Sequence, residues 1–340
     1  MTVRHEVIRI LEENRGRAVS GEMLAEQLGV SRAAVWKAVK ALQAEGYPIE
    51  AGKNRGYTLR SESDRISEEG IRLYLPERWR QTAIEVLPVV DSTNTYAKKQ
   101  VAAGVYAGQA AKKDGEEGAS GRAIIAANAQ TAGRGRLGRS FFSPADTGIY
   151  MTLVLAAGCR TADFLPITVA AAVAVSRVIE RFTEETPKIK WVNDVWIGDR
   201  KVCGILTEGI SDFENGTLEA AVVGIGINVA TERAAFPEAV QGTAVSLGTA
   251  RAPRNELIAA VAAELFQLAE YLQDPALMQE YRERSLILGK EIYWEAGGVR
   301  HEGRAAAIND AGNLEVETAD GLVVLNSGEV SIRPVKRQDS

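Results

Sequence analysis

The sequence predicts a multidomain α+β protein with an N-terminal winged helix-turn-helix, a central mixed-sheet α+β domain and a small C-terminal β-barrel-like domain. Three observations favour this fold class. Short amphipathic helices with serine caps fill the first 45 residues, and strand-like apolar runs surround a long apolar helix in the middle of the chain. After residue 288, short strands alternate with Asp-Gly-type turns. A chain of 340 residues also exceeds what one hydrophobic core usually supports.

Charge is unevenly distributed along the chain. The net charge is −5, so the whole molecule is not a general binder of polyanions. Residues 1–60, however, contain ten Lys and Arg against seven Glu, which gives +3 there and −8 in the remainder. A basic N-terminal segment in an acidic protein indicates a nucleic-acid-binding module at that end.

Composition argues against several classes of protein. His5 and His301 are the only histidines, so neither a histidine triad nor a histidine-rich zinc site is expected, and we predict no metal site. Cys159 and Cys203 form no disulfide framework and are expected to be reduced core thiols. The N-terminus lacks a signal peptide's apolar segment, and the longest apolar run, 164–175, is shorter than the roughly 20 residues of a membrane helix. We therefore expect a cytoplasmic protein without membrane contact.

The first 45 residues predict three helices. Residues 3–14 place four apolar side chains on one helical face. Ser20 can cap a second helix and Ser31 a third, which extends over residues 32–45. Because the short turn 29–31 joins the second and third helices, this segment predicts a helix-turn-helix.

Basic residues on the third helix and in the following hairpin predict DNA binding. Residues 47–59 form two short strands around a Gly-Lys-Asn-Arg-Gly tip, as in a basic wing. Side chains on such a helix and wing meet phosphates or base edges in the major groove. The predicted DNA-binding residues are Ser31, Arg32, Lys37, Lys40, Lys53 and Arg55. The alternative is a helical interaction module with a solvated charged face.

A polar linker at residues 61–70 is expected to precede the main domain, which begins near Ile71. An apolar strand at 83–90 leads into Asp91-Ser-Thr-Asn94, where Asp91 or Ser92 can cap a helix towards Ala103. Strand-to-helix corners of this kind bind small polar ligands, although plain capping explains the tetrapeptide equally well. Residues 107–122 predict an exposed loop without a chemical role.

The segment Gln130 to Arg139, the arginine loop, lies between two apolar runs and interleaves three glycines with three arginines. Glycines let the backbone approach a ligand, and arginines bind carboxylate and phosphate oxygens. Gly133-Arg-Gly135-Arg-Leu-Gly138 formally matches a dinucleotide fingerprint, but no helix opens at its third glycine and no acid lies about 20 residues on. We expect a loop that is mobile until an anion orders it; the alternative is a solvated basic hairpin.

A second polar motif lies in residues 188–197, which alternate as one strand. Lys190 lies there among apolar residues, and an unpaired buried charge is costly, so it needs either an anionic ligand or an ion pair with Asp194. Segments 201–208 and 218–229 predict adjacent strands, the second ending at Asn228. Buried or amphipathic helices are predicted at 162–182, 255–273 and 275–288.

Taken together, these segments resemble bifunctional biotin–protein ligases, the type that doubles as the biotin operon repressor. The resemblance covers nearly the whole chain and is carried, besides the winged helix, by Asp91-Ser-Thr-Asn94, Gln130 to Arg139, Phe142-Ser-Pro144, Lys190-Trp-Val-Asn-Asp194, Lys201 to Leu206, Gly224-Ile-Gly-Ile-Asn228 and Ser327 to Arg333. Two departures are Val192, where the family usually has proline, and the long loop at 107–122.

The resemblance implies a role for each matching residue. The residues implied to bind biotin are Ser92, Thr93, Asn94, Gln130, Arg134, Gly135, Arg136 and Lys190. Those implied to bind the adenylate are Arg139, Phe141, Asn193 and Asn228. Lys190, Arg136 and Arg134 are the implied catalytic residues, because they offset the repulsion between the biotin carboxylate and the α-phosphate.

The family also implies domains, substrates and partners. We expect a winged helix at 1–62, a class II synthetase-like ligase domain at 63–284 and an SH3-like barrel at 285–340. Biotin and ATP are the implied substrates, with Mg²⁺ accompanying the pyrophosphate. The implied partners are a biotin carboxyl carrier protein, operator DNA and a second copy of the chain, since paired half-sites favour a dimer.

Three other functions stay open at this point. A non-enzymatic winged-helix regulator could sense biotin or another small acid, and a helix-turn-helix could contact only protein. A lipoate or octanoate ligase shares the core fold, but the long arginine loop and the winged helix argue against it.

Overall fold

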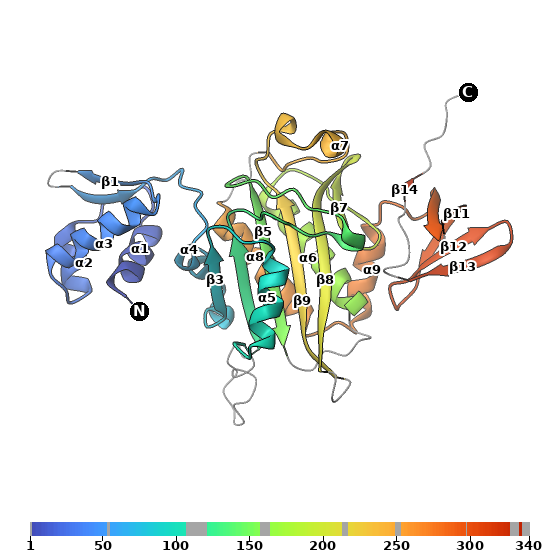
Figure 1. The fold of residues 1–340 in the computed structure, drawn as a ribbon, viewed down its shortest axis with the longest axis horizontal. Helices are drawn as coiled ribbons and strands as arrows, with labels where there is room; N and C mark the ends of the chain where they lie inside the picture. Colours follow the sequence, from blue (N-terminus) through green and yellow to red (C-terminus); the bar gives the residue numbers. More distant parts are fainter. Residues whose placement is uncertain are drawn as a thin grey trace. The chain divides into compact units, whose positions relative to one another are not determined.

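The computed structural model describes residues 2–52, 55–106, 121–156, 164–212, 217–248, 253–296, 298–326 and 333–334 (Figure 1). Lys53, Cys159, most of the 107–122 loop and residues 327–332 therefore lie outside the described part of the chain. The chain divides into two compact units, Met1–Arg80 with Ala252–Ala260, and Gln81–Arg251 with Val261–Ser340. None of the helices in the described ranges is long and apolar enough to span a membrane.

The first unit contains the predicted winged helix. Its elements are α1 (Val3–Glu13), α2 (Gly21–Gln27), α3 (Arg32–Ala44), β1 (Ile49–Gly52) and β2 (Gly56–Leu59). The Ser20 and Ser31 hydroxyls accept hydrogen bonds from the backbone N–H groups of Met23 and Ala34, so both predicted caps are confirmed. Apolar side chains of the three helices form one core that includes Leu11, Leu24 and Leu42.

The predicted linker at 61–70 is not a free polar segment. Arg254 donates to the Asp64 carboxylate at 2.7 Å, and Asn255 accepts from the Ser67 backbone N–H at 3.0 Å. A helix, α4 (Glu68–Tyr74), begins directly after Ser67, whose hydroxyl caps it. The polar composition of this segment predicted a linker, because composition does not show which distant residues a polar side chain will bind. Here the partners are the first residues of α8 (Arg254–Leu268).

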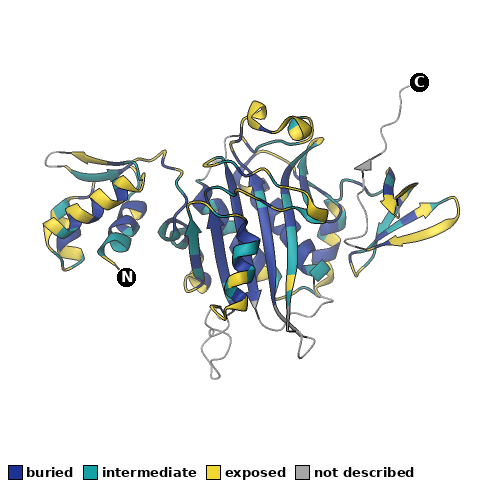
Figure 2. Cartoon of the chain, in the orientation of Figure 1, coloured by how far each residue is buried: buried dark blue, intermediate teal, exposed yellow. Residues whose placement is uncertain are grey.

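A seven-stranded mixed sheet forms the centre of the second unit. Its strands are β3 (Ala83–Leu87), β4 (Arg122–Ala127), β5 (Gly148–Ala156), β6 (Lys188–Lys190), β7 (Asp194–Ile197), β8 (Arg200–Asp212) and β9 (Thr217–Asn228). They are ordered β3-β4-β5-β9-β8-β7-β6. β3 pairs parallel to β4 and the other neighbours pair antiparallel, so the predicted mixed sheet is confirmed. Its central strands are almost wholly buried (Figure 2).

Helices cover both faces of the sheet, as expected for strands that are apolar on both sides. α5 (Thr93–Ala102) packs on β5, β8 and β9. On the opposite face lies α6 (Phe164–Phe182), where the Thr168 hydroxyl donates to that of Thr207 at 2.7 Å. α9 (Pro275–Glu283) packs against α6.

Three predicted boundaries were wrong. Residues 188–197 form the hairpin β6–β7 rather than one strand, with a turn at 191–193 in which the Trp191–Val192 peptide is cis. α9 ends at Glu283 instead of residue 288, because Leu286 donates its N–H to Ile189 and continues as extended chain. α8 likewise ends at Leu268 and not at 273. In each case apolar periodicity continues past the point where backbone pairing changes.

The predicted C-terminal β domain is a five-stranded antiparallel sheet. It comprises β10 (Glu291–Ala296), β11 (Val299–Ile308), β12 (Leu314–Thr318), β13 (Gly321–Leu325) and β14 (Arg333–Pro334), ordered β13-β12-β11-β10-β14. Gly312 and Gly321 have positive φ, which explains the turns predicted there. Gly312 also accepts a 2.8 Å hydrogen bond from the Trp191 indole, next to the Lys190 motif.

Short elements complete the connections of the chain. They are the 3₁₀ turns η1 (Glu77–Trp79), η3 (Arg136–Gly138) and η5 (Arg233–Ala235), and the single-turn helix α7 (Glu238–Gln241). Of these, η3 lies within the arginine loop.

Candidate active site

Glycines on two adjacent strands create a hollow in the α5-covered face of the sheet. The register places Gly204 opposite Gly226 and Leu206 opposite Gly224, so the three glycines lie on the same face. A Cβ on Gly224 would lie 2.2 Å from the Asn94 Oδ1, and one on Gly226 would lie 2.5 Å from the Phe141 ring. The missing side chains therefore let Asn94 and Phe141 approach the sheet closely.

Asn94, at the start of α5, is fixed by three hydrogen bonds. Its Nδ2 donates to the Leu206 carbonyl at 3.1 Å and to the Glu208 carboxylate at 2.9 Å. Its Oδ1 accepts from the Thr152 hydroxyl at 2.7 Å. The side chain is almost fully buried, so these contacts set the amide orientation without ambiguity about which end donates.

Glu208 connects Asn94 to the arginine loop. Its carboxylate accepts from Lys98 at 2.7 Å and lies 3.6 Å from the Arg134 guanidinium. Burial raises the pKa of Glu208, but the hydrogen bonds from Lys98 and Asn94 and the charges of Lys98 and Arg134 lower it below its ordinary value. A carboxylate that favours its ionised form thus lies at one end of the hollow, already paired with cations.

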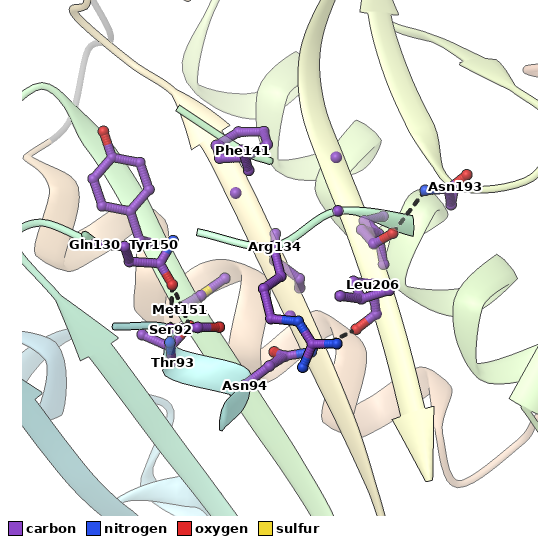
Figure 3. Close-up of a pocket in the computed structure, with 16 residues that line it drawn as sticks. Ser92, Thr93, Asn94, Gln130, Arg134, Phe141, Tyr150, Met151, Asn193 and Leu206 are labelled. Carbon is purple, nitrogen blue, oxygen red and sulfur yellow. Dashed lines mark hydrogen bonds between the residues drawn. The ribbon is translucent and has the colours of Figure 1, made fainter. Parts of the chain in front are cut away.

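Gln130 and Thr93 form the opposite wall. The Gln130 Oε1 accepts from the Thr93 backbone N–H at 2.9 Å and from the Thr93 hydroxyl at 3.2 Å, while its Nε2 donates to the Ser143 hydroxyl at 2.9 Å. Ser92 is buried beside them, and its hydroxyl does not cap α5. Figure 3 shows these side chains converging on the hollow with Asn94 and Arg134.

The arginine loop folds back on itself. Gly135 donates to the Arg139 carbonyl at 2.7 Å, and Phe141 donates to the Gly133 carbonyl at 2.8 Å. Gly133 is buried, and a Cβ there would lie 2.4 Å from the Phe141 carbonyl oxygen. Of its three glycines, Gly138 takes positive φ, and Leu137 does so too. The loop therefore has a defined hydrogen-bonded form; the mobility predicted for it stays a prediction.

Two arginines of the loop point in different directions. Arg134 extends over the sheet towards Asn94 and lines the hollow (Figure 3). Arg136 instead donates to the Asn193 Oδ1 at 2.9 Å and lines a second cavity of about 520 Å³, which the hollow adjoins through Asn193, Ile205 and Leu206. Burial is the main cause of the lowered pKa of Arg136, and Asp194 partly opposes it.

Lys190 does not line the hollow in this structure. It is on β6, with its ammonium 5.0 Å from the centre of the Trp196 ring. Asp194, the ion-pair partner considered from the sequence, lies 2.8 Å from Lys201. The Lys190 motif therefore borders the hollow through Asn193, whose Nδ2 donates to the Ile205 carbonyl at 2.7 Å.

Asn228 lies on the glycine-lined face beyond Gly226, opposite Gly148 of β5. Its Nδ2 donates to the Val245 carbonyl at 3.2 Å, and the residue is buried without lining the hollow. Arg139 is exposed.

Most of the predicted ligand residues are thus brought together. Those that line the hollow are Ser92, Thr93, Asn94, Gln130, Arg134, Gly135, Phe141 and Asn193; Arg136, Lys190, Arg139 and Asn228 do not. The free space in the hollow is about 40 Å³, room for little more than a water molecule. The loop and Phe141 fill the remainder, so a bicyclic ligand requires them to move.

Several residues of the site were missed from the sequence. The sequence does not distinguish three of them from ordinary strand residues: Glu208, Tyr150 and Thr152. The strand register brings them to the site. Tyr150 lines the hollow, packs edge-on against Phe141 and donates to the Pro144 carbonyl at 2.9 Å. The glycines of β8 and β9 form the floor of the hollow. The signal that could have revealed this floor is Gly224-Ile-Gly226, because glycine at alternate positions of an apolar strand marks a place where another group approaches the backbone closely.

The predicted DNA-binding residues are on the exposed surface of the first unit. Arg32, Lys37 and Lys40 are exposed on α3, and Arg55 is exposed beside the wing tip, while Lys53 lies outside the described residues. Ser31 is exposed, but its hydroxyl already caps α3. Gly56 permits the wing to lie against the segment that precedes α2, since a Cβ there would meet the Val19 carbonyl at 2.1 Å.

Comparison with known proteins supports both the helix-turn-helix of the first unit and the ligase-like domain of the second. Three family models match in chain order: an HTH domain at residues 3–58, the biotin/lipoate A/B protein ligase family at 86–228, and the biotin protein ligase C-terminal domain at 287–333. Within the described residues, no cluster of three or more His, Cys, Asp or Glu side chains could bind a metal ion.

Similar proteins match along most of the sequence. The bifunctional ligase/repressor BirA of Escherichia coli is 30% identical over 337 residues, with 95% of each chain covered, and that of Bacillus subtilis is 29% identical, with 97% of this chain and 99% of its own covered. Among solved structures, the biotin protein ligase of Aquifex aeolicus in complex with biotin and ATP aligns with a TM-score of 0.58 and 25% identity, over 74% of this chain and 99% of its own. The chain belongs to the bifunctional biotin ligase/repressor family.

Proposed function

We propose that the protein is an ATP-dependent biotin–protein ligase that also represses transcription by binding DNA. The observation that carries this proposal is the hollow lined by eight predicted ligand residues under an arginine loop, in a chain that also contains a winged helix. The Escherichia coli and Bacillus subtilis relatives carry both activities in their names, and the Aquifex aeolicus structure binds biotin and ATP.

The side chains that line the hollow suit the bicyclic end of biotin once the arginine loop and Phe141 move aside. A ureido group presents two N–H donors and one carbonyl acceptor, and Ser92, Thr93, Asn94 and Gln130 supply hydroxyls and amides of both kinds. Apolar groups of Met151, Ile225 and Phe141 flank them and suit the thioether ring. The valeryl chain would then direct the carboxylate towards Asn193 and the arginines.

The first reaction joins two anions. The biotin carboxylate oxygen attacks the α-phosphorus of ATP, the bond to the bridging oxygen breaks, and pyrophosphate leaves. Arg134, Arg136 and Lys190 carry the positive charge that offsets this repulsion and stabilises the transition state. Lys190 has a long, flexible side chain, and we propose that it leaves the Trp196 ring to reach the phosphate.

The second reaction transfers the acyl group. An unprotonated lysine amine of the carrier attacks the acyl carbon, the acyl–phosphate bond breaks, AMP leaves with the electron pair, and the nitrogen loses one proton to solvent. We propose that Arg139, Phe141, Asn193 and Asn228 bind the adenylate meanwhile, with Asn228 on the same face of the sheet beyond Gly226. The closed arginine loop excludes water from the mixed anhydride.

Mg²⁺ is proposed to arrive with ATP. It usually binds through phosphate oxygens and one or two carboxylates rather than through an all-protein cage. Asp194, the carboxylate of the Lys190 motif, lies 2.8 Å from Lys201, and it is the residue we propose to approach the ion. The metal would supply neutralisation of the pyrophosphate leaving group.

The partners proposed for the chain are a biotin carboxyl carrier protein and operator DNA, in a cytoplasmic setting. We also propose that bound adenylate promotes a homodimer by ordering the arginine loop. Equal sedimentation coefficients with and without biotin plus ATP would contradict that dimer. The domain limits of 1–62, 63–284 and 285–340 remain proposals, because the compact units divide the chain differently.

Intact-mass spectrometry of a biotin carboxyl carrier domain tests the ligase. Incubation with the protein, biotin and ATP should add one biotinyl group, and omission of ATP or replacement of the acceptor lysine by arginine should abolish the addition. Pyrophosphate release that depends on biotin should accompany it. A carrier of unchanged mass and no pyrophosphate would leave the non-enzymatic regulator as the better explanation.

A further inference from the structure

The outward face of α3 carries a tryptophan that the core does not use. Val35, Ala38, Val39 and Leu42 form the buried side of this helix. Trp36 lies on the other side and is 52% exposed, although indole is among the largest apolar surfaces a side chain can offer. An exposed tryptophan contributes little to folding and has an apolar ring with a polar N–H, so it is available for contact with another molecule.

Cationic side chains surround Trp36 on the helix. Arg32 is one turn before it, Lys40 one turn after it, and Lys37 is its neighbour in sequence; all three are exposed. The rest of this face carries only small side chains, because its other exposed residues are Ala33, Ala41 and Ala44. Trp36 is therefore the bulkiest apolar group on a narrow, positively charged helix surface.

This arrangement fits double-stranded DNA better than a protein surface. The flanking cations suit phosphates on the two sides of a major groove, and the alanines let the helix backbone approach the base edges. In that groove the apolar feature of the bases is the thymine C5-methyl group. The indole N–H can in addition donate to a base acceptor.

We propose that Trp36 determines sequence specificity by contacting thymine methyl groups in the major groove of the operator. This inference rests on the proposed repressor function and specifies what the recognition helix reads. Arg32, Lys37 and Lys40 then supply affinity through phosphates, while Trp36 supplies discrimination between thymine and the other bases.

The test begins with selection of binding sites from a random duplex DNA library, using the full-length protein with biotin and ATP. Each thymine of the enriched site is then replaced singly by deoxyuridine, which removes only the methyl group. The affinity of the wild-type protein should fall about fivefold to tenfold at one or two positions. Trp36→Ala should bind the original site more weakly and lose sensitivity to those same replacements.

Met23→Ala is the matched control, because Met23 is 53% exposed but lies on α2. It should keep the deoxyuridine sensitivity of the wild type. Trp36→Ala should fold normally, as judged by an unchanged melting temperature, since the indole lies outside the core.

Two results overturn the proposal while leaving the repressor function intact: a wild-type affinity that no deoxyuridine replacement changes, or a Trp36→Ala variant that keeps the sensitivity. A Trp36→Ala variant whose DNA-free dimer dissociates in sedimentation would instead place the indole in a protein interface and would also overturn it. A library from which no sequence is enriched rejects the repressor function itself, and the role of Trp36 with it.

Discussion

Gly224→Ala is expected to damage the proposed biotin site through one side chain. Gly224 lies on β9, and its φ is not in the left-handed region, so the backbone accepts alanine. The new Cβ would, however, lie 2.2 Å from the Asn94 Oδ1 and 2.8 Å from the Asn94 Cγ. Asn94 is short and held by hydrogen bonds, so it has to leave its place rather than adjust.

The magnitude follows from the contacts that Asn94 loses. The bonds of Asn94 with Leu206, Glu208 and Thr152 are internal to the protein, so their loss lowers the free energy of unfolding by about 1 kcal/mol each. A displaced Asn94 also loses its proposed contacts with biotin, and one or two hydrogen bonds to the ligand correspond to a loss of roughly tenfold to a hundredfold in kcat/KM for biotin. Since Asn94 is proposed to bind ground-state biotin, most of the loss should appear in KM.

Biotin-dependent pyrophosphate release measures this effect. Gly242→Ala is the matched control, because no atom lies within 4 Å of a Cβ there and its φ of −79° suits alanine. A double-mutant cycle with Asn94→Ala decides the mechanism: Gly224→Ala should add little once the asparagine amide is gone. Additive losses in that cycle would refute the argument, and so would wild-type kinetics of Gly224→Ala.

Further variants separate the steps of the reaction. Arg136→Gly should release free biotinyl-adenylate, detected by chromatography, because the loop loses its anchor to Asn193; adenylate retained as in wild type would contradict this. Lys190→Ala should lower the rate of adenylate formation at least tenfold, and full activity would remove Lys190 from the site. Glu208→Gln should weaken biotin binding about tenfold in titration calorimetry, since Asn94 and Arg134 lose a charged partner. Because the folded pKa of Glu208 is lowered, this penalty should be constant above the ordinary value of 4.5 and disappear only as the pH falls through the lowered pKa; a penalty that changes between pH 6 and 8 would contradict it.

Local features of the fold could be predicted because they depend on neighbouring residues. The Ser20 and Ser31 caps, the turn at Gly312 and the adjacency of β8 and β9 all follow from residues close in sequence. Features set by distant partners could not be predicted. The pairing of Asp64 with Arg254 spans 190 residues, and composition alone gives no sign of it.

The site divides in the same way. Ser92, Thr93, Asn94 and Gln130 could be identified because each belongs to a motif at a corner or in a loop. Glu208 could not, since it acquires its role only where β8 passes beneath Asn94. The sequence also did not reveal that Arg134 and Arg136 face different cavities. In an irregular loop, the spacing of two side chains in sequence does not fix their directions.

The glycines of the floor explain why the site lies in the middle of a sheet rather than at its edge. Glycine weakens a strand, because it has no side chain to pack and loses more backbone freedom on folding. In β8 and β9 this cost is offset by the helices on both faces and by neighbouring strands on both sides, which fix the backbone. We propose that a bicyclic ligand requires such a rigid floor, because the arginine loop above it is predicted to open and close. The same reasoning predicts that alanine at Gly204 or Gly226 alters ligand binding more than it alters the free energy of unfolding.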